Sequence, residues 1–577
     1  MRLPVVPACL LLGLLAAVLS GVGVVSASDD RASQDLLIRA GQLFDAPAPP
    51  AGSDAGAHRT LQSATPLLNE IKVHAPGLVP EALAGLADYL ERPTLLTEQF
   101  DTPHFRIHYA TVGEDRPAGW PNEEYLRAIA GACETVWSAY HETGGWPQPA
   151  SDGAAGGDGR IDVYVRDLGW GVYGYALHED LPGRRGKTGF IVLENDYAGC
   201  ETLTLFEALQ VSLAHEYFHL IEFGYGYDPE ANWFMEQMAT MMEGRVYPAI
   251  ADRLRYVVQF ADRPYRRLDL SDGSFEYGAW LWPEFLRQRW GEDLLRAIWE
   301  TWGVGGRTML AAIDEQLRAR GTGLDETFLD WAVWNAFLGP DDDHAHYEQA
   351  GRIPAAVSRQ GLVSSYPVER WHPAPWQQAE RLGANYVELR PAGESADNRL
   401  TVHLEACATV GGAVLIAWRW DGEAPVIEPI VLAGGRGVFV LSEWDQYERA
   451  CLVVANGSAA TECCDFALDA TTCYAVAGVE EEIVGGLGVR LASAPNPFDP
   501  YTTISFSLPE QTPVALRIFD AQGRVIDTLI DGTRSAGTHG IRWQGPALAP
   551  RGPGAGVYFC EIRTPLGRER LRLVRLQ

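Results

Sequence analysis

Positive charge is scarce in this sequence, and lysine is almost absent from it. Acidic residues outnumber Lys and Arg by 76 to 46, which gives a formal net charge of −30. Lys72 and Lys187 are the only lysines, so nearly all positive charge is arginine, which we attribute to coding bias rather than mechanism. Binding to nucleic acid requires basic surface that neutralises phosphates, so the composition argues against a nucleic-acid partner.

Several chemical signatures are also missing. The sequence has no Gly-x-Ser-x-Gly nucleophile turn and no phosphate-binding P-loop. None of its cysteines has Cys-x-x-Cys spacing, which argues against a cysteine zinc site. After the first 27 residues, no stretch approaches the ~20 apolar residues that span a bilayer. We therefore expect no transmembrane span in the mature chain.

The N-terminal residues predict export. Arg2 precedes an apolar run from Ala8 to Val25, and Val25-Ser26-Ala27 has the small-x-small pattern of a cleavage site. We predict a signal peptide over 1–27 and a secreted or cell-surface protein. The alternative, a membrane anchor, is disfavoured by the small residues that end the run. Without Cys9 eight cysteines remain, which permits disulfides but allows 105 pairings.

The length of 577 residues predicts about three or four domains. Residues 28–95 are helix-leaning, with a Pro/Gly-rich break, and fit either a prosegment or an N-terminal cap. Residues 96–365 begin with strand patterns at 105–109, 160–165 and 189–193 and continue with helices from 203 to about 338, an α+β domain. Short alternating runs over 366–480 and 490–577 predict two all-β sandwich (Ig-like) domains.

The run His215-Glu216-Tyr217-Phe218-His219 lies in a predicted helix over 203–223. At about 100° per residue the two histidines are about 40° apart, so both imidazoles can reach one metal ion. Glu216, at about 100° from His215, lies beside the metal axis, where a general base must stand. An apolar stripe is expected on the opposite side: Phe206, Leu209, Leu213, Tyr217 and Leu220.

A catalytic zinc ion usually has three protein ligands. Glu236, in a second predicted helix over 232–243, is our choice for the third. Glu243 shares its face and is a candidate for orienting a ligand histidine. Glu222 is a weaker alternative ligand. The alternative to a metal site is a chance match, because HExxH is short, but the patterned helix and the suitably placed Glu236 favour the site.

Other polar groups are weaker candidates. His104 and His108 favour packing or hydrogen bonding over metal binding. Asp152, Asp158 and Asp162 surround a Gly-rich segment and are a calcium candidate, although their spacing is not that of an EF-hand loop. Tyr277 either donates to the oxyanion formed during peptide attack or packs within its aromatic segment.

The site resembles that of the gluzincin peptidases, in which a downstream glutamate completes a His-His-Glu zinc site. Over about residues 95–365 the chain is similar to a family of secreted bacterial metallopeptidases first named from a myxobacterium, with shared patterns at 102–109, 157–164 and 214–219. The resemblance implies a zincin-like fold, Zn²⁺ held by His215, His219 and Glu236, and catalysis by Glu216. Gln237 and Glu222 depart from the pattern without removing a ligand.

The C-terminal region resembles the FlgD-like immunoglobulin fold and type IX secretion sorting domains. The motifs are Ala494-Pro495-Asn496-Pro497-Phe498, Thr502-Thr503-Ile504-Ser505-Phe506 and Gly556-Val557-Tyr558-Phe559, and Cys560 departs from the usual apolar residue. This resemblance implies an outer-membrane secretion machinery as a partner of the C-terminal domain.

Together these patterns predict a secreted zinc metallopeptidase that acts on protein or peptide substrates. By resemblance, the strand at 189–193 is the edge that aligns the substrate backbone. We also predict that residues 28–95 are released on activation. The alternative function is a surface-attached binding or adhesion protein with a vestigial metal site, which the intact residues His215, Glu216, His219 and Glu236 disfavour.

Overall fold

The structure is a computed structural model that describes part of the chain. The predicted signal peptide over 1–27 lies outside the described residues. The described residues are 36, 38–40, 62–78, 86–169, 171–198, 200, 202–392, 399–407, 411–460, 463–473, 490–494, 496, 498, 501–508, 511–520, 524–535, 537–544, 556–565 and 567–575.

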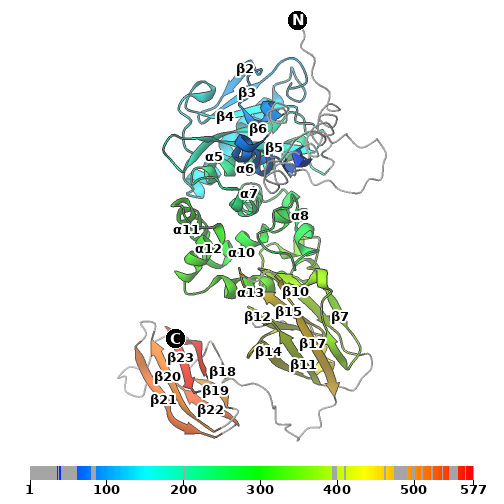
Figure 1. Cartoon of the computed structure of the whole chain (residues 1–577), viewed down its shortest axis with the longest axis vertical. Helices are drawn as coiled ribbons and strands as arrows, with labels where there is room; N and C mark the ends of the chain where they lie inside the picture. Colours follow the sequence, from blue (N-terminus) through cyan, green and yellow to red (C-terminus); the bar gives the residue numbers. More distant parts are fainter. Residues whose placement is uncertain are drawn as a thin grey trace, which may run out of the picture.

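The first unit is built on a mixed six-stranded sheet (Figure 1). In spatial order its strands are β1 (Gln62–Ser63), β5 (Val172–Asp180), β6 (Lys187–Glu194), β4 (Ile161–Arg166), β3 (Phe105–Tyr109) and β2 (Glu98–Asp101). The central strands are rich in Val, Ile, Leu and Tyr and are buried at most positions, as expected for a sheet covered on both faces. The three predicted strands correspond to β3, β4 and β6.

The predicted substrate edge at 189–193 is wrong, because these residues lie in β6, between β5 and β4. The strand towards the edge is β5, which runs antiparallel to β6. Its outer side is paired by β1, which is parallel to it, with Gln62 opposite Val172 and Ser63 opposite Gly174. Part of the predicted N-terminal segment over 28–95 therefore belongs to this sheet.

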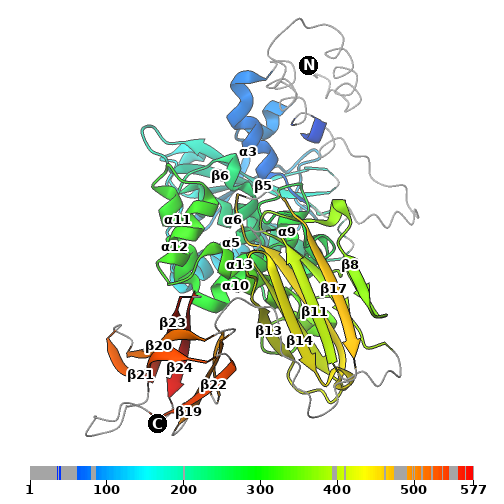
Figure 2. The same ribbon diagram turned by 60° about the horizontal axis from the view of Figure 1, so that its bottom comes forward.

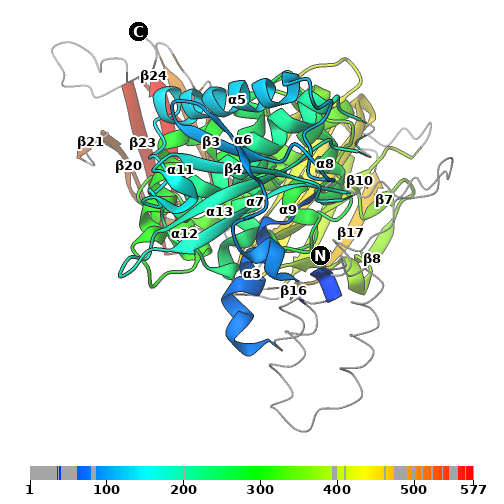
Figure 3. The same cartoon turned by 90° about the horizontal axis from the view of Figure 1, so that it is seen from above.

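Helices cover the sheet and continue beyond it. Their bounds are α3 (Thr65–His74), α5 (Glu124–Trp137), α6 (Leu205–Phe223), α7 (Asn232–Val246), α8 (Asp252–Ala261), α9 (Phe275–Gly278), α10 (Leu281–Trp290), α11 (Glu292–Gly303), α12 (Met309–Arg318) and α13 (Leu324–Asn335). α6 contacts β5, β6, α5 and α7. Figure 3 shows it between α5 and α7. α3 packs against β5 (Figure 2).

The predicted apolar stripe on α6 is buried apart from Phe206, and burial extends beyond it to the rest of the helix. Phe206 from the predicted stripe is 38% exposed, whereas nearly every side chain from Ala208 to Phe223 is buried. The reason is that α6 is enclosed by the sheet, α5 and α7, so it has no solvent-facing side beyond its first turn. That first turn is closed by a capping box between Thr204 and Glu207.

The second unit is a sandwich of two sheets, drawn in yellow-green and ochre in Figure 1. One sheet has the order β13 (Val426–Ile430), β12 (Gly412–Arg419), β15 (Tyr447–Asn456), β10 (Gly383–Leu389) and β7 (Gly361–Val363); the other has β14 (Arg436–Ser442), β11 (Arg399–Ala406), β17 (Phe466–Cys473) and β8 (Val368–Trp371). The sandwich therefore begins at β7, before the predicted start at residue 366. Its outer face shares a core with the helices, since Tyr386 and Val453 join the helical cluster.

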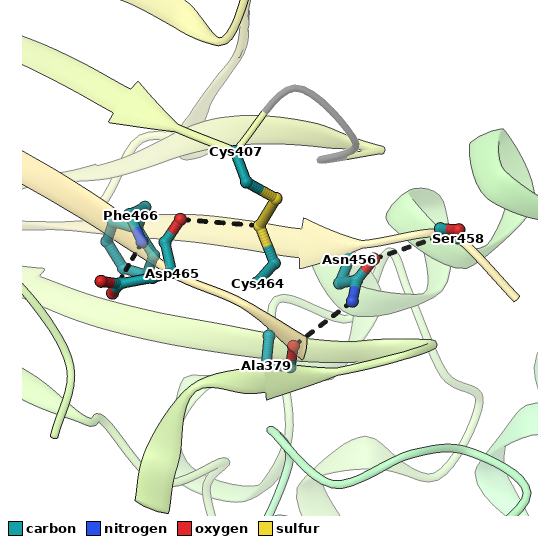
Figure 4. The surroundings of a disulfide bond; sticks show 7 residues. All are labelled: Ala379, Cys407, Asn456, Ser458, Cys464, Asp465 and Phe466. Carbon is teal, nitrogen blue, oxygen red and sulfur yellow. Dashed lines mark hydrogen bonds between the residues drawn. A yellow bond between two sulfur atoms is a disulfide. The ribbon is translucent and has the colours of Figure 1, made fainter. Parts of the chain in front are cut away.

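A disulfide between Cys407 and Cys464 links the residue after β11 to the short strand β16 (Cys463–Cys464), as Figure 4 shows. β16 pairs with β9 (Ala379–Glu380). The bond closes a loop over 57 residues of sequence. Such a link restricts the unfolded chain, which stabilises the sandwich.

The third unit comprises β18 (Arg490–Ala494), β19 (Thr502–Leu508), β20 (Thr512–Asp520), β21 (Val525–Arg534), β22 (Gly537–Trp543), β23 (Gly556–Thr564) and β24 (Gly567–Arg575). These strands form a three-stranded and a four-stranded sheet with their own apolar core, which includes Ile504, Leu516 and Trp543. The chain is thus a mixed α/β protein with sandwich-like sheets. Among the described residues, no helix has the length and apolar character to traverse a lipid bilayer.

Candidate metal centre

Two adjacent helices bring the predicted ligands together. α6 carries His215 and His219 one turn apart, and α7 packs against it and carries Glu236. His215 Nε2 lies 3.1 Å from Glu236 Oε2, and His219 Nε2 lies 3.1 Å from Glu236 Oε1. One ligand atom of each residue lies within 4.8 Å of the others, and no second group of this kind occurs among the described residues.

The reversal between α6 and α7 depends on a turn that contains Gly226. Its φ of +137° is a backbone conformation that other residues rarely adopt, and a Cβ there would lie 3.1 Å from Arg185 Nε. The turn lets α7 fold back on α6. Glu236 consequently faces the two histidines from the neighbouring helix.

The second nitrogen of each imidazole has a carboxylate partner. His215 Nδ1 lies 2.9 Å from Glu243 Oε1, and His219 Nδ1 lies 2.7 Å from Glu222 Oε2. Such partners fix the ring orientation and direct Nε2 towards a metal. Glu243 is where the sequence analysis placed a histidine-orienting residue. Glu222 lies on the outer nitrogen of His219 and is not among the three converging groups.

The converging groups are buried, and their protonation is strongly perturbed. Burial disfavours charge on His219, but Glu236 and Glu222 outweigh it and raise its pKa to about 9. Burial also opposes ionisation of Glu236, yet the imidazoles beside it lower its pKa to about 2. Burial raises the pKa of Glu222 and of Glu243 to about 7 in spite of the histidine beside each.

The donor set fits a divalent first-row metal ion. Two imidazole nitrogens and one carboxylate are the ligands of many catalytic zinc sites. The buried His219 Nε2 makes no aligned hydrogen bond, although it lies 3.1 Å from Glu236 Oε1. A buried nitrogen of this kind, directed at the same point as two other donors, is the arrangement that a metal ion satisfies.

Glu216 lies beside the converging groups and is 1% exposed. Its Oε2 accepts a hydrogen bond of 2.6 Å from the hydroxyl of Thr65, the first residue of α3. It also lies close to β5, since a Cβ on Gly174 would stand 3.5 Å from Glu216 Cγ. The predicted base is therefore next to the strand that the N-terminal segment covers.

A cavity opens beside His215 and Glu216. Its lining includes Ser63 from β1, Tyr173 from β5 and Tyr277 from α9. Burial, together with the charge of Glu236 and a hydrogen bond to it, raises the pKa of Tyr277 well above its usual value. Tyr277 thus keeps its proton beside the carboxylate and lies within reach of the centre, as an oxyanion donor must.

The weaker sequence candidates lie elsewhere. His104 pairs with Glu134 and stacks on Trp137, and His108 bonds Asp162, so both have the structural partners expected for packing residues.

The calcium candidate does not form a single site. Asp152 and Asp162 are bound by Arg92, whereas Asp158 pairs with Arg106 and Arg160. Arginine already neutralises these carboxylates, and they do not converge on one point as calcium ligands would.

Two features of the site were missed by sequence reasoning. One is Thr65, whose contact with Glu216 spans 151 residues of sequence. The other is β5, whose segment Val-Tyr-Gly-Tyr-Ala-Leu-His-Glu-Asp mixes glycine and charged residues with apolar ones. The signal available for Thr65 was the Ser63-Ala64-Thr65-Pro66 segment, which is typical of a helix start but carries no information about what the helix contacts.

Comparison with known proteins found no matching family and no matching curated protein. Similar solved structures cover parts of the chain. PorZ, a surface component of the type-IX secretion system of Porphyromonas gingivalis, is 17% identical over 22% of this chain and 15% of its own, with a TM-score of 0.12. Latent dimeric PorU from Porphyromonas gingivalis is 15% identical over 29% of this chain and 16% of its own, with a TM-score of 0.15.

A β-glucuronidase from Bacteroides uniformis is 14% identical over 33% of this chain and 26% of its own, with a TM-score of 0.12. The chain therefore spans about a quarter or less of the length of these three structures. TM-scores of this size carry no argument about function. The candidate site is accordingly interpreted from its own geometry.

Proposed function

We propose that the chain is a secreted zinc-dependent peptidase that hydrolyses bonds in protein or peptide substrates. The observation that carries the proposal is the convergence of His215, His219 and Glu236, with Glu216 beside them. No other described group has this geometry. The perturbed pKa values of buried groups around one cavity are also typical of active sites.

Zn²⁺ is the proposed metal, held by His215, His219 and Glu236. When bound, zinc polarises a carbonyl and lowers the pKa of water to about 7. Glu216 would accept the proton of the attacking water and return it to the leaving amine. Glu243 and Glu222 would hold the imidazoles in place, and Tyr277 would donate to the oxyanion.

The proposal includes location and partners. The signal-peptide pattern over 1–27 supports export, and the sorting-domain resemblance over 490–577 supports engagement of an outer-membrane secretion machinery. The net charge of −30 supports the absence of nucleic acid from the partners.

The decisive experiment compares wild type with Glu216→Gln and with Glu300→Gln, a matched change at an exposed position of α11. Because Thr65 contacts Glu216, hydrolysis of a denatured protein is measured in both the wild-type and the Thr65→Val background. We expect one zinc per chain in every variant. We expect Glu216→Gln to reduce hydrolysis by at least about a hundredfold, within the range for a lost acid–base group.

If the zinc-loaded chain hydrolyses nothing beyond its Glu216→Gln counterpart in either background, the peptidase proposal fails. A chain that binds no zinc at all would contradict it more directly. Zinc binding without hydrolysis would favour the adhesion alternative with a vestigial site.

A further inference from the structure

The outer side of β5 is covered by α3 as well as by the two residues of β1. Ala64 N donates to Gly174 O at 3.0 Å. Further along, side chains of α3 take over the role of a neighbouring strand. Ala176 N donates to Thr65 Oγ1 at 2.7 Å, and Asn69 Nδ2 donates to Ala176 O at 2.8 Å.

The same pattern continues at the next outward-facing residue of β5. His178 N donates to Asn69 Oδ1 at 2.9 Å, and Lys72 Nζ donates to His178 O at 2.7 Å. The five contacts therefore satisfy the carbonyl of Gly174 and both backbone groups of Ala176 and His178, which a partner strand would otherwise pair. An exposed row of such groups is the usual docking site for an extended peptide.

The spacing of α3 explains how a helix can do this. Residues 65, 69 and 72 follow the i, i+4, i+7 spacing of one helix face, with steps of about 6.0 and 4.5 Å along the axis. Outward-facing residues of a strand repeat every about 6.6 Å. The two periods are close enough for long polar side chains to span the difference.

Apolar contacts hold the segment in place. Leu68 is fully buried and Ala64 lies with it in a cluster that contains Val172, Tyr175 and Leu177 of β5. The hydrogen bonds between α3 and β5 are thus flanked by packed apolar side chains, as in a stable interface.

The segment also reaches the proposed base. The hydroxyl of Thr65 accepts from Ala176 N and donates its own proton to Glu216 Oε2. A hydroxyl bound at 2.6 Å to a carboxylate is a strong, charge-assisted hydrogen bond. Thr65 therefore occupies Oε2, one of the two oxygens with which Glu216 could accept a proton.

We infer that the β5 edge is the docking site of an extended peptide, and that residues 62–74 occupy it as an intramolecular competitor that keeps the site latent. The inference rests on the proposed peptidase function. Substrate binding would replace Thr65, Asn69 and Lys72 by the substrate's own backbone groups. The site would thus recognise an unfolded backbone rather than a particular side chain.

The competitor is not itself aligned as a substrate. Only Gln62 and Ser63 are extended, and the chain becomes helical at Thr65, directly beside Glu216. The backbone from Ala64 onwards is engaged in helical hydrogen bonds, beginning with Leu68 N to Ala64 O. Its carbonyls therefore point along the helix axis, which removes them from attack.

The test uses the full chain loaded with Zn²⁺ and the double variant Thr65→Val, Asn69→Leu. Both changes conserve size and remove the three hydrogen bonds that these side chains make to β5 and the one to Glu216. Hydrogen exchange is measured by mass spectrometry on fragments that cover β5. Hydrolysis of a denatured protein is measured in parallel, with Val73→Thr, an exposed position of α3, as the matched control.

We expect exchange of the Ala176 and His178 amides to rise at least about tenfold in the double variant, and kcat/KM to rise by a similar factor. The reason is that apparent affinity scales with the fraction of molecules whose edge is open. Thr65→Ser keeps the hydroxyl and should behave as wild type, as should Val73→Thr. Lys72→Met removes only the contact with the His178 carbonyl and should give a smaller change in the same direction.

The inference is overturned if the β5 amides of the double variant exchange faster while kcat/KM stays unchanged. It is also overturned if their exchange stays as slow as in wild type. If thermal unfolding shows that the double variant does not fold, Lys72→Met decides the question by the same two measurements. Failure of the peptidase function would give a different result. Hydrogen exchange of β5 would rise in the double variant, but no variant would hydrolyse the denatured protein faster than the same variant carrying Glu216→Gln. If wild type, the double variant and Lys72→Met hydrolyse the protein equally fast, and Glu216→Gln abolishes this hydrolysis, the peptidase function stands and the proposed latency fails.

Discussion

The interface of α6 with α7 and the interior of the middle sandwich are both buried, but their composition differs sharply. Six ionisable side chains lie in the helix pair, each at most 6% exposed: His215, Glu216, His219, Glu222, Glu236 and Glu243. The sandwich interior over β7–β17 consists of side chains such as Leu, Val, Ala and Phe. Among its described residues, the buried polar side chains are Asn385 and Asn456.

This difference separates packing from chemistry. A buried ionisable group is costly unless it is paired, and even a paired cluster often stabilises less than apolar residues of the same shape. Asn385 and Asn456 each donate to a backbone carbonyl and so serve the local chain path. The helix pair carries far more buried ionisable groups than the sandwich interior, as is typical of functional sites, and this supports the proposed metal site.

The largest expected effect is the loss of metal binding on Glu236→Ala. Loss of a residue that merely orients a ligand lowers metal affinity by about 10–100-fold, so loss of a ligand should exceed about a hundredfold. Isothermal titration of the full chain with Zn²⁺ measures this directly. An unchanged zinc affinity would mean that Glu236 is an ordinary buried residue, and that the ionisable groups of the helix pair do not form a metal site.

The sandwich should respond in the opposite way. Leu452→Ala, at a fully buried position of β15, should lower the free energy of unfolding of the sandwich by about 2–5 kcal/mol, through lost burial and a cavity. Leu362→Ala on β7, where the side chain is 58% exposed, should change it by less than about 0.5 kcal/mol. Urea unfolding followed by fluorescence measures both.

Neither sandwich variant should alter zinc affinity. A drop in affinity for Leu452→Ala in chains that are still folded would show that the two regions are coupled. The shared core between the sandwich and the helices makes this a meaningful control.

A smaller effect is expected at the outer nitrogens of the histidines. Glu243→Gln and Glu222→Gln should each lower zinc affinity by about 10–100-fold, because the carboxylates orient the imidazoles without binding the metal. Glu300→Gln on α11 should have no effect. If Glu222→Gln matched Glu236→Ala in size, Glu222 would be a ligand, as the weaker sequence alternative has it.

Part of the site could be predicted because it follows from helix geometry. The i, i+4 spacing of His215 and His219 places both on one face, and Glu236 lies on the next helix after a turn. β3 and β4 alternate apolar with polar residues, and β6 contains the apolar run 190–193; both patterns predict strands. In each case the local sequence carries the information.

What could not be predicted depends on contacts between distant segments. Glu222 is one turn from His219 whichever nitrogen it binds, so spacing alone leaves its role open. β5 was missed because Gly174, His178 and Glu179 interrupt the apolar pattern. The docking of α3 on β5 could not be predicted, because neither the sequence of α3 nor that of β5 indicates which other segment it contacts.

The last prediction concerns His178, a buried residue of β5 that lies next to the α3 contacts. Burial, and after it the charges of Lys72 on α3 and Lys187 on β6, lower its pKa from 6.5 to about 3 against the opposing charge of Asp180. Its ring contacts Phe223 and Tyr227, and neither ring nitrogen has a hydrogen-bond partner among the residues that the structure describes. The folded state therefore keeps this imidazole neutral, whereas the unfolded chain protonates it below pH 6.5.

The sign follows from this difference. Between pH 6.5 and 3 the unfolded state binds a proton that the folded state does not, so this group lowers stability as the pH falls, by up to about 1.4 kcal/mol per pH unit. His178→Phe should remove that dependence, which makes the stability difference from wild type shift by about 2 kcal/mol between pH 6.5 and 4.5. The matched change His403→Phe, at an exposed position of β11, should show no such shift. Urea unfolding at the two pH values measures the difference, and hydrogen exchange of β5 at pH 4.5 locates it. A stability difference that does not change with pH would mean that His178 is solvated in the folded state, and that β5 is less tightly covered by α3 than its contacts indicate.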